Sequence, residues 1–101
     1  MLRQAVLAAA LSAFAPAAWC ETHTVVIENM RFQPAALTVK RGDRVVWVNR
    51  DVVPHTATAA PSFDSAAIAP GASWGITLKK PGRHEVVCTM HPMMKSSLVV
   101  K

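Results

Sequence analysis

Apolar and polar residues alternate with a period of two through much of the chain beyond residue 23. The clearest example is Trp74, Ile76 and Leu78, which alternate with small or polar neighbours. Successive side chains of a β-strand point to opposite faces, so this alternation predicts strands with one buried face. Such strands are predicted over residues 24–29, 37–40, 74–79, 83–88 and 97–101.

Residues 44–49 differ from these segments because they are apolar at both odd and even positions. This composition suits a strand that is covered on both sides within a sandwich better than an edge strand. The Arg-Gly-Asp sequence at residues 41–43 and the Pro-Gly pair at 81–82 predict tight turns. Residues 30–36 predict a connection, and residues 56–72 predict an irregular loop with room for one short strand. The total is about seven strands and no helical period, which predicts an all-β sandwich.

The composition limits the class of protein further. A chain of 101 residues that is 51% hydrophobic forms one folded domain at most. Its formal charge of +5 is scattered, and the basic pairs at residues 40–41 and 79–80 have no interleaved aromatic residues. A nucleic-acid surface combines a basic groove with aromatic stacking, so no nucleic-acid partner is expected. The positive charge favours an acidic protein partner instead.

Residues 1–20 have the composition of a secretory signal peptide, with Arg3 ahead of an apolar run. The run is interrupted by Ser12 and Pro16 and is shorter than the roughly 20 residues of a membrane-spanning helix. We therefore expect cleavage, export to the periplasm and no membrane insertion of the mature chain. The small-residue rule permits a cut after Ala17 or after Cys20, and we favour the second. It leaves residues 21–101 as one domain.

The position of signal-peptide cleavage determines whether Cys88 has a possible disulfide partner. Cleavage after Cys20 leaves Cys88 as a lone thiol in an oxidising compartment, where an unpaired cysteine needs burial or a metal. Cleavage after Ala17 would instead allow a disulfide between Cys20 and Cys88. A lipid on Cys20 is disfavoured by the bulky Trp19 before it.

Residues 88–94 read Cys-Thr-Met-His-Pro-Met-Met, which places a thiol, an imidazole and two thioethers within seven positions. Two histidines, one cysteine and a weak axial methionine are the ligands of a blue copper site. His55 follows the apolar segment at residues 44–49 and can supply the second imidazole. The predicted metal ligands are therefore His55, Cys88, His91 and one methionine of the pair Met93 and Met94. Taken singly, each of these residues could be an ordinary core or surface residue.

The chain resembles the cupredoxins, and its C-x2-H-x2-M loop is most similar to that of the amicyanin group. The resemblance extends from about residue 24 to residue 101. It includes Asn-Met-Arg-Phe-Gln-Pro at residues 29–34, Arg-Val-Val-Trp-Val-Asn at 44–49 and Pro-His-Thr at 54–56. This resemblance implies a Greek-key β-sandwich that binds one copper ion, with Met94 as the axial ligand.

The same resemblance implies roles for residues around the ligands. Asn49 would link the two ligand-bearing segments through its amide, with Thr89 accepting the link, and such contacts orient ligands and tune a metal. His91 would lie at the solvent edge of the site. The exposed surface around it, where a redox partner would dock, would be formed by Pro54, Met90, Pro92 and Met93.

These observations predict a monomeric blue copper protein that carries single electrons between a donor and an acceptor protein. Four protein ligands leave no open position for a substrate, so we do not expect an enzyme. A periplasmic protein that delivers or stores copper is the alternative within the same chemistry. A disulfide-bonded adhesion-type sandwich is a third hypothesis, but it gives His55 and His91 no role. The remaining histidines are assigned no ligand role, and His23 is expected to be solvated.

Overall fold

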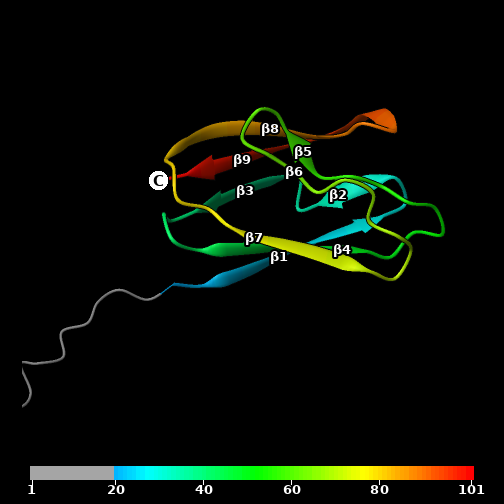
Figure 1. The fold of residues 1–101 in the computed structure, drawn as a ribbon, viewed down its shortest axis with the longest axis horizontal. Helices are drawn as coiled ribbons and strands as arrows, with labels where there is room; N and C mark the ends of the chain where they lie inside the picture. Colours follow the sequence, from blue (N-terminus) through cyan, green and yellow to red (C-terminus); the bar gives the residue numbers. More distant parts are fainter. Residues whose placement is uncertain (1–19) are drawn as a thin grey trace, which may run out of the picture.

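Two β-sheets pack face to face in this protein (Figure 1), whose computed structural model describes residues 20–101. One sheet has the order β2-β1-β4-β7 and the other has the order β3-β9-β8-β5-β6. The nine strands of the described part are β1 (Thr22–Glu28), β2 (Arg31–Gln33), β3 (Ala36–Val39), β4 (Arg44–Asn49), β5 (Thr58–Ala59), β6 (Phe63–Asp64), β7 (Ser73–Thr77), β8 (Gly82–Cys88) and β9 (His91–Val100).

Most strand pairs are antiparallel, but each sheet also contains one parallel pair. β1 runs parallel to β4, with Val25 opposite Trp47, and β3 runs parallel to β9, with Leu37 opposite Leu98. Parallel neighbours need a crossover, so the chain passes repeatedly from one sheet to the other. The all-β sandwich predicted from the sequence is confirmed, and the described residues contain no helix.

Nine strands are present where about seven were expected, and the two additional strands are short and lie in segments expected to be irregular. β2 lies in the predicted connection, while β5 and β6 both lie in the predicted loop at residues 56–72. Two or three residues offer too few positions for an alternating pattern to be visible. β9 also begins at His91 rather than at residue 97, so the methionine-rich segment is itself part of a strand.

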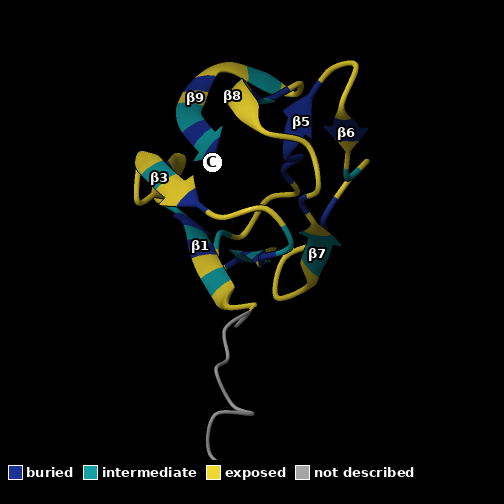
Figure 2. Ribbon diagram, turned by 90° about the vertical axis from the view of Figure 1, so that its left-hand side faces the viewer, coloured by how far each residue is buried: buried dark blue, intermediate teal, exposed yellow. Residues whose placement is uncertain are grey.

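β4 forms the centre of its sheet, as its composition predicted, with β1 on one side and β7 on the other. Val45 and Trp47 are buried, whereas Val46 and Val48 are only half-buried, so the outer face is less covered than the sequence indicated. The Trp47 ring lies 5.5 Å from that of Phe63 and 5.7 Å from that of Trp74, measured between centroids. Figure 2 shows buried positions on strands of both sheets, which therefore share one core.

A buried polar group lies just before the start of β4, in the predicted turn at residues 41–43. Gly42 takes a positive φ of 91°, which glycine adopts without strain, and the turn buries the carboxylate of Asp43. Asp43 accepts hydrogen bonds from the backbone N–H groups of Glu21 and Lys40 at 2.9 and 3.0 Å, and its Oδ2 lies 2.9 Å from Nε2 of His23. His23 is thus held at the base of β1, and the expectation that it is solvated was wrong.

These contacts predict how the stability of the fold changes in acid. The backbone N–H groups of Glu21 and Lys40, together with His23, lower the pKa of Asp43 to about 2. A lowered pKa stabilises the folded state above the unfolded-state value of about 4, and this stabilisation disappears as the pH falls towards 2. Asp43→Asn should therefore unfold at lower urea than the wild type at pH 7, and the two midpoints should converge below pH 3. If Asp43→Asn lowered the urea midpoint equally at pH 7 and below pH 3, the charge of Asp43 would not be the source of the stabilisation.

The predicted signal peptide at residues 1–20 lies outside the described residues except for Cys20, which is exposed. Within residues 20–101, no helix is long and apolar enough to cross a membrane.

Candidate metal centre

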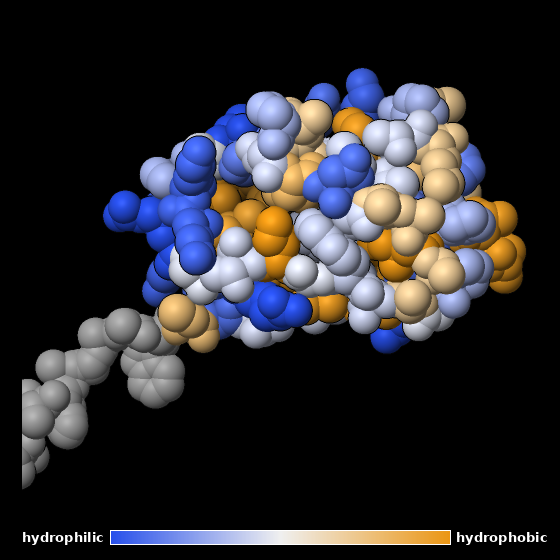
Figure 3. Space-filling view, viewed as in Figure 1, coloured by the Kyte–Doolittle hydropathy of each residue, from blue (hydrophilic) through white to orange (hydrophobic). Residues whose placement is uncertain are grey.

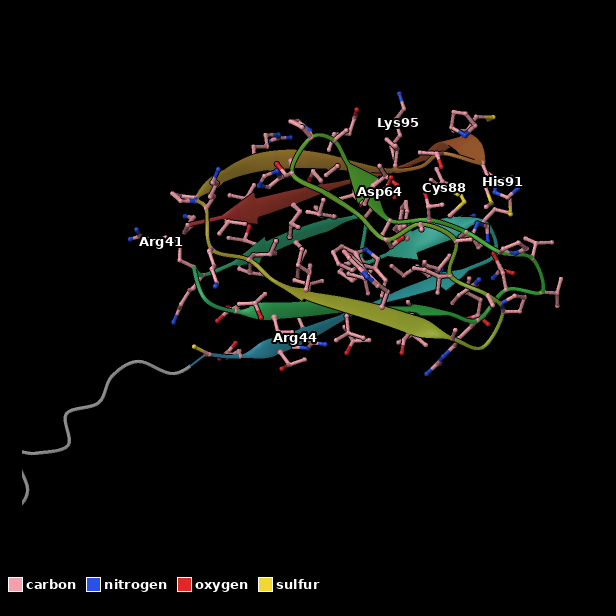
Figure 4. The ribbon with its side chains drawn as sticks, in the orientation of Figure 1. Arg41, Arg44, Asp64, Cys88, His91 and Lys95 are labelled. Atoms are coloured by element: carbon pink, nitrogen blue, oxygen red, sulfur yellow. The ribbon has the colours of Figure 1, made fainter. Side chains whose placement is uncertain are left out.

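Cys88 and His91 face each other where β8 passes into β9 (Figure 4). The strand pairing is regular as far as Val87 and shifts between Val87 and Cys88, so that Cys88 is paired directly with His91. Such an irregularity re-aims side chains at the end of a ladder. Thr89 and Met90 form the turn between the two strands. Cys88 is fully buried and His91 is half-buried.

His55 comes from a different part of the chain and reaches the same place. It lies beyond the end of β4, where it forms an isolated bridge with Ile68 through backbone hydrogen bonds of 3.2 and 2.7 Å. Its ring is completely buried. The fixed backbone and the buried ring allow little rearrangement, so the position of this imidazole is set by the fold.

The three side chains have the spacing that a single metal ion requires. Sγ of Cys88 lies 3.7 Å from Nδ1 of His55 and 3.5 Å from Nδ1 of His91, and all three donor atoms lie within 4.8 Å of one another. With metal–sulfur and metal–nitrogen bonds of about 2.3 and 2.0 Å, two donors in a trigonal site are about 3.7 Å apart. The residues therefore fit a trigonal copper ion.

The adjacent methionines differ in exposure because they occupy successive positions of β9. Both border the hollow that His91 lines, but Met94 is buried at 5% exposure, whereas Met93 is 92% exposed. Successive side chains of a strand point to opposite faces, so only one of the two can face the interior. This difference favours Met94 over Met93 as the residue nearest the centre.

Thr56, which the sequence analysis missed, connects the two ligand-bearing segments. Its backbone N–H donates to Sγ of Cys88 at 3.3 Å, and its hydroxyl accepts a 2.9 Å hydrogen bond from the N–H of Thr89. The Asn49 amide instead donates to Val53 and Ile68 at 2.9 Å each, so the expected link from Asn49 to Thr89 is not formed. Asn49 orders the loop that leads to His55. The only signal for Thr56 in the sequence was that it follows His55 directly.

Asp51 is a second residue that the sequence did not reveal. Its Oδ2 lies 2.7 Å from Nε2 of His55, on the side of the ring opposite Cys88. The carboxylate also accepts hydrogen bonds from the N–H groups of Asn29 and Met30 at 2.7 and 2.9 Å. Burial opposes the charged carboxylate, but the donors at Met30, His55 and Asn29 outweigh burial and lower the pKa of Asp51. Asp51 thus remains an anion that fixes the proton of His55 on Nε2 and leaves Nδ1 free for a metal.

Asp51→Asn should shift the balance between the two oxidation states of copper. The carboxylate makes His55 a stronger donor, and a stronger donor favours Cu(II), so we expect the reduction potential to rise by up to about 60 mV, the equivalent of a tenfold change in a one-electron equilibrium. Protein-film voltammetry measures this change. Asp64→Asn is the matched control, since it removes the same charge from an exposed residue that contacts Thr58 and Ala66. An equal rise in both variants would indicate a general charge effect.

An apolar surface surrounds His91 at this end of the molecule. All four residues expected there are exposed, namely Pro54, Met90, Pro92 and Met93. The structure adds three further exposed apolar side chains from neighbouring turns, Met30, Val52 and Val53. Figure 3 shows apolar side chains gathered at the corresponding right-hand end of the molecule. Exposed apolar patches of this kind mark interaction surfaces.

Both cysteines of the described chain are free. Cys88 is buried in the centre, whereas Cys20 is exposed at the start of the described residues. The disulfide between them, which one cleavage position would permit, is therefore not formed in this structure.

A β-sandwich with a buried Cys88 between two imidazoles, and with Met94 beside it, defines a type 1 copper protein. Residues 2–100 match the family model described as a cupredoxin-like domain. Amicyanin from Paracoccus denitrificans is 31% identical over 97 residues, which cover 89% of this chain and 74% of the relative. Amicyanin from Paracoccus versutus is 29% identical over 83 residues, which cover 76% of this chain and 63% of the relative, slightly under two thirds of its length.

A solved structure of the oxidized state of an amicyanin mutant has a TM-score of 0.75 and 27% identity, covering 79% of this chain and 82% of that one. The chain belongs to the cupredoxin-like family. The site and these relatives indicate a blue copper electron-transfer protein with one copper ion per chain.

Proposed function

We propose that His55, Cys88, His91 and Met94 bind one copper ion and that the protein carries single electrons between two redox proteins. The observation that supports this most strongly is the spacing of 3.5 and 3.7 Å between the buried thiol and the two imidazole nitrogens. Copper bound there would alternate between Cu(I) and Cu(II). Soft sulfur and imidazole donors suit both states.

The protein residues keep the site rigid during this change. Asp51 holds His55, Thr56 donates its N–H to the Cys88 sulfur, and Cys88 and His91 are paired across the end of the β8–β9 ladder. Ligands fixed in this way need little rearrangement on gain or loss of an electron. The N–H of Thr56 also withdraws charge from the sulfur, which is one of the means by which such sites set their reduction potential.

His91 provides the route for the electron to the surface. Its Nδ1 faces Cys88, so the other edge of this half-buried ring is directed away from the sulfur and towards the apolar surface. A partner that covers Pro54, Met90, Pro92 and Met93 would exclude water and come close to this edge. Redox encounters of this kind are small and weak, which permits rapid release.

The formal charge of +5, which falls to +4 when Arg3 is removed with the signal peptide, favours an acidic donor or acceptor. We infer a monomer, because a small patch suits transient encounters better than a permanent dimer. The signal-peptide composition of residues 1–20 and the family relationship support export, and we infer a periplasmic location. We also infer that the chain is not an enzyme, since four protein ligands leave no position for a substrate.

The visible spectrum of the purified protein with Cu(II) tests the proposed function. An intense blue absorption that ascorbate bleaches and a mild oxidant restores is expected for an electron carrier. A colourless protein that retains only Cu(I) would contradict this function and favour copper delivery or storage.

Substitution of each methionine tests the axial ligand. Met94→Gln should lower the reduction potential by more than about 60 mV, a tenfold change in a one-electron equilibrium, and should alter the spectrum, because the amide oxygen is a harder ligand that favours Cu(II). Met93→Gln is the matched control and should leave both nearly unchanged, since that side chain is exposed. The reverse result would assign the axial position to Met93.

A further inference from the structure

Every methionine of the described chain lines one hollow beside the metal centre. The hollow is bounded by Met30, Met90, Met93 and Met94, together with His91 and Pro92. The sequence has five methionines, and the fifth is Met1, which lies outside the described residues. Figure 4 shows side-chain sulfur atoms gathered at the end of the molecule that carries Cys88 and His91.

Only one of these four thioethers is needed by the copper centre. Met94 is buried, whereas Met30, Met90 and Met93 are 43%, 45% and 92% exposed and come from two separate turns and a strand. Among residues 20–101, no charged side chain lines this hollow, and Arg31 and Lys95 line an adjoining hollow that shares Met30, Met93 and Met94. An uncharged surface of soft sulfur atoms is a poor site for divalent metals with hard ligands and a good one for Cu(I), which soft thioethers select.

We propose that Met30, Met90 and Met93 form a second binding site, selective for Cu(I), at the mouth of the copper centre. The inference rests on the proposed function, because it gives this surface a role in loading the centre as well as in docking a partner. The ring of His91 lines this hollow, and its Nδ1 lies 3.5 Å from the sulfur of Cys88. Transfer inward exchanges thioether ligands for imidazole and thiolate ligands, with no change in oxidation state.

The backbone at Met30 has an unusual conformation that side-chain hydrogen bonds hold in place. Asn29 and Met30 both take positive φ values, 57° and 59°, which are uncommon for residues other than glycine. The carboxylate of Asp51 holds both N–H groups and also contacts His55. The same carboxylate therefore holds the turn that carries one of the proposed thioethers and the imidazole of the copper centre.

Competition titration of Cu(I) tests the inference on the copper-loaded, ascorbate-reduced protein under nitrogen. A chromophoric Cu(I) chelator reports the free ion. We expect one further equivalent of Cu(I) to bind, and we expect the methyl resonances of Met30, Met90 and Met93 to shift in a methionine-labelled sample. The triple variant Met30→Leu, Met90→Leu and Met93→Leu keeps the apolar surface without its sulfur, and should retain the first copper and lose the second.

The control variant is Val52→Leu, which changes an exposed apolar residue of the same surface and should retain both equivalents. Slower loading of the copper-free triple variant by Cu(I), compared with Val52→Leu, is the second expected result. Binding of no second equivalent, or its survival in the triple variant, would overturn the inference. Failure of the proposed function is distinguishable, because the first equivalent and the blue colour would then be missing.

Discussion

Replacement of Cys88 by serine will abolish the intense visible absorption of the Cu(II) protein. That absorption requires a thiolate bound to copper, and Cys88 is the only cysteine within reach of the two imidazoles, since Cys20 is exposed at the far end of β1. Serine is close in size, and it can still accept the N–H of Thr56, so the β-sandwich should remain folded. Absorption and circular dichroism spectra of the same sample measure both properties.

Cys20→Ser, made in a protein that retains residue 20, provides the matched control for this experiment. It removes the other thiol of the described chain without touching the metal centre, so the blue absorption should be unchanged. Loss of colour in both variants would indicate that a disulfide or a shared site involves Cys20. Retention of colour in Cys88→Ser would refute the ligand assignment.

Removal of copper will lower the melting temperature by about 15 °C or more. A ligand that binds only the folded state and is present at about 1,000 times its dissociation constant adds about 4 kcal/mol of stability. For a domain of this size, each kcal/mol corresponds to about 4–8 °C. Differential scanning calorimetry of the copper-free and copper-loaded forms measures the shift.

The copper-free protein should nevertheless fold, which makes the comparison possible. Within residues 20–101, every buried side-chain nitrogen and oxygen has a hydrogen-bond partner without a metal. His55 is held by Asp51, and the sulfur of Cys88 accepts the N–H of Thr56. Addition of copper to Cys88→Ser should produce a much smaller shift. An equal shift in that variant would mean that the stabilising copper binds elsewhere.

An electron carrier requires a rigid metal site and an exposed surface for its partner, and residues 88–94 contribute to both. His91 and Met94 lie on β9, a ten-residue strand, and Cys88 ends β8, so these proposed ligands are attached to a hydrogen-bonded ladder. The intervening positions, Met90 and Met93, are exposed. Seven residues of the chain therefore hold both the proposed ligands, which are buried or half-buried, and exposed methionines that a partner could cover.

The sequence by itself determined the class of fold and indicated which residues are the proposed metal ligands. Alternating apolar positions revealed the longer strands, because burial of one strand face requires that period. The short spacing of Cys88, His91 and Met94 was visible as a motif because these residues are close in the chain. The contribution of His55 was visible only as a histidine that follows a buried strand.

Tertiary structure decided which groups support those ligands. Asp51 contacts the turn at Asn29 and Met30, 22 and 21 positions away, and Thr56 contacts Cys88 across 32 positions. No periodicity or local propensity records such contacts, because they depend on which strands are neighbours within each sheet. For the same reason the sequence assigned the link to Asn49 and missed Thr56. Hydrogen bonds between distant segments are set by packing, whereas strand faces and short motifs are set by the local order of residues.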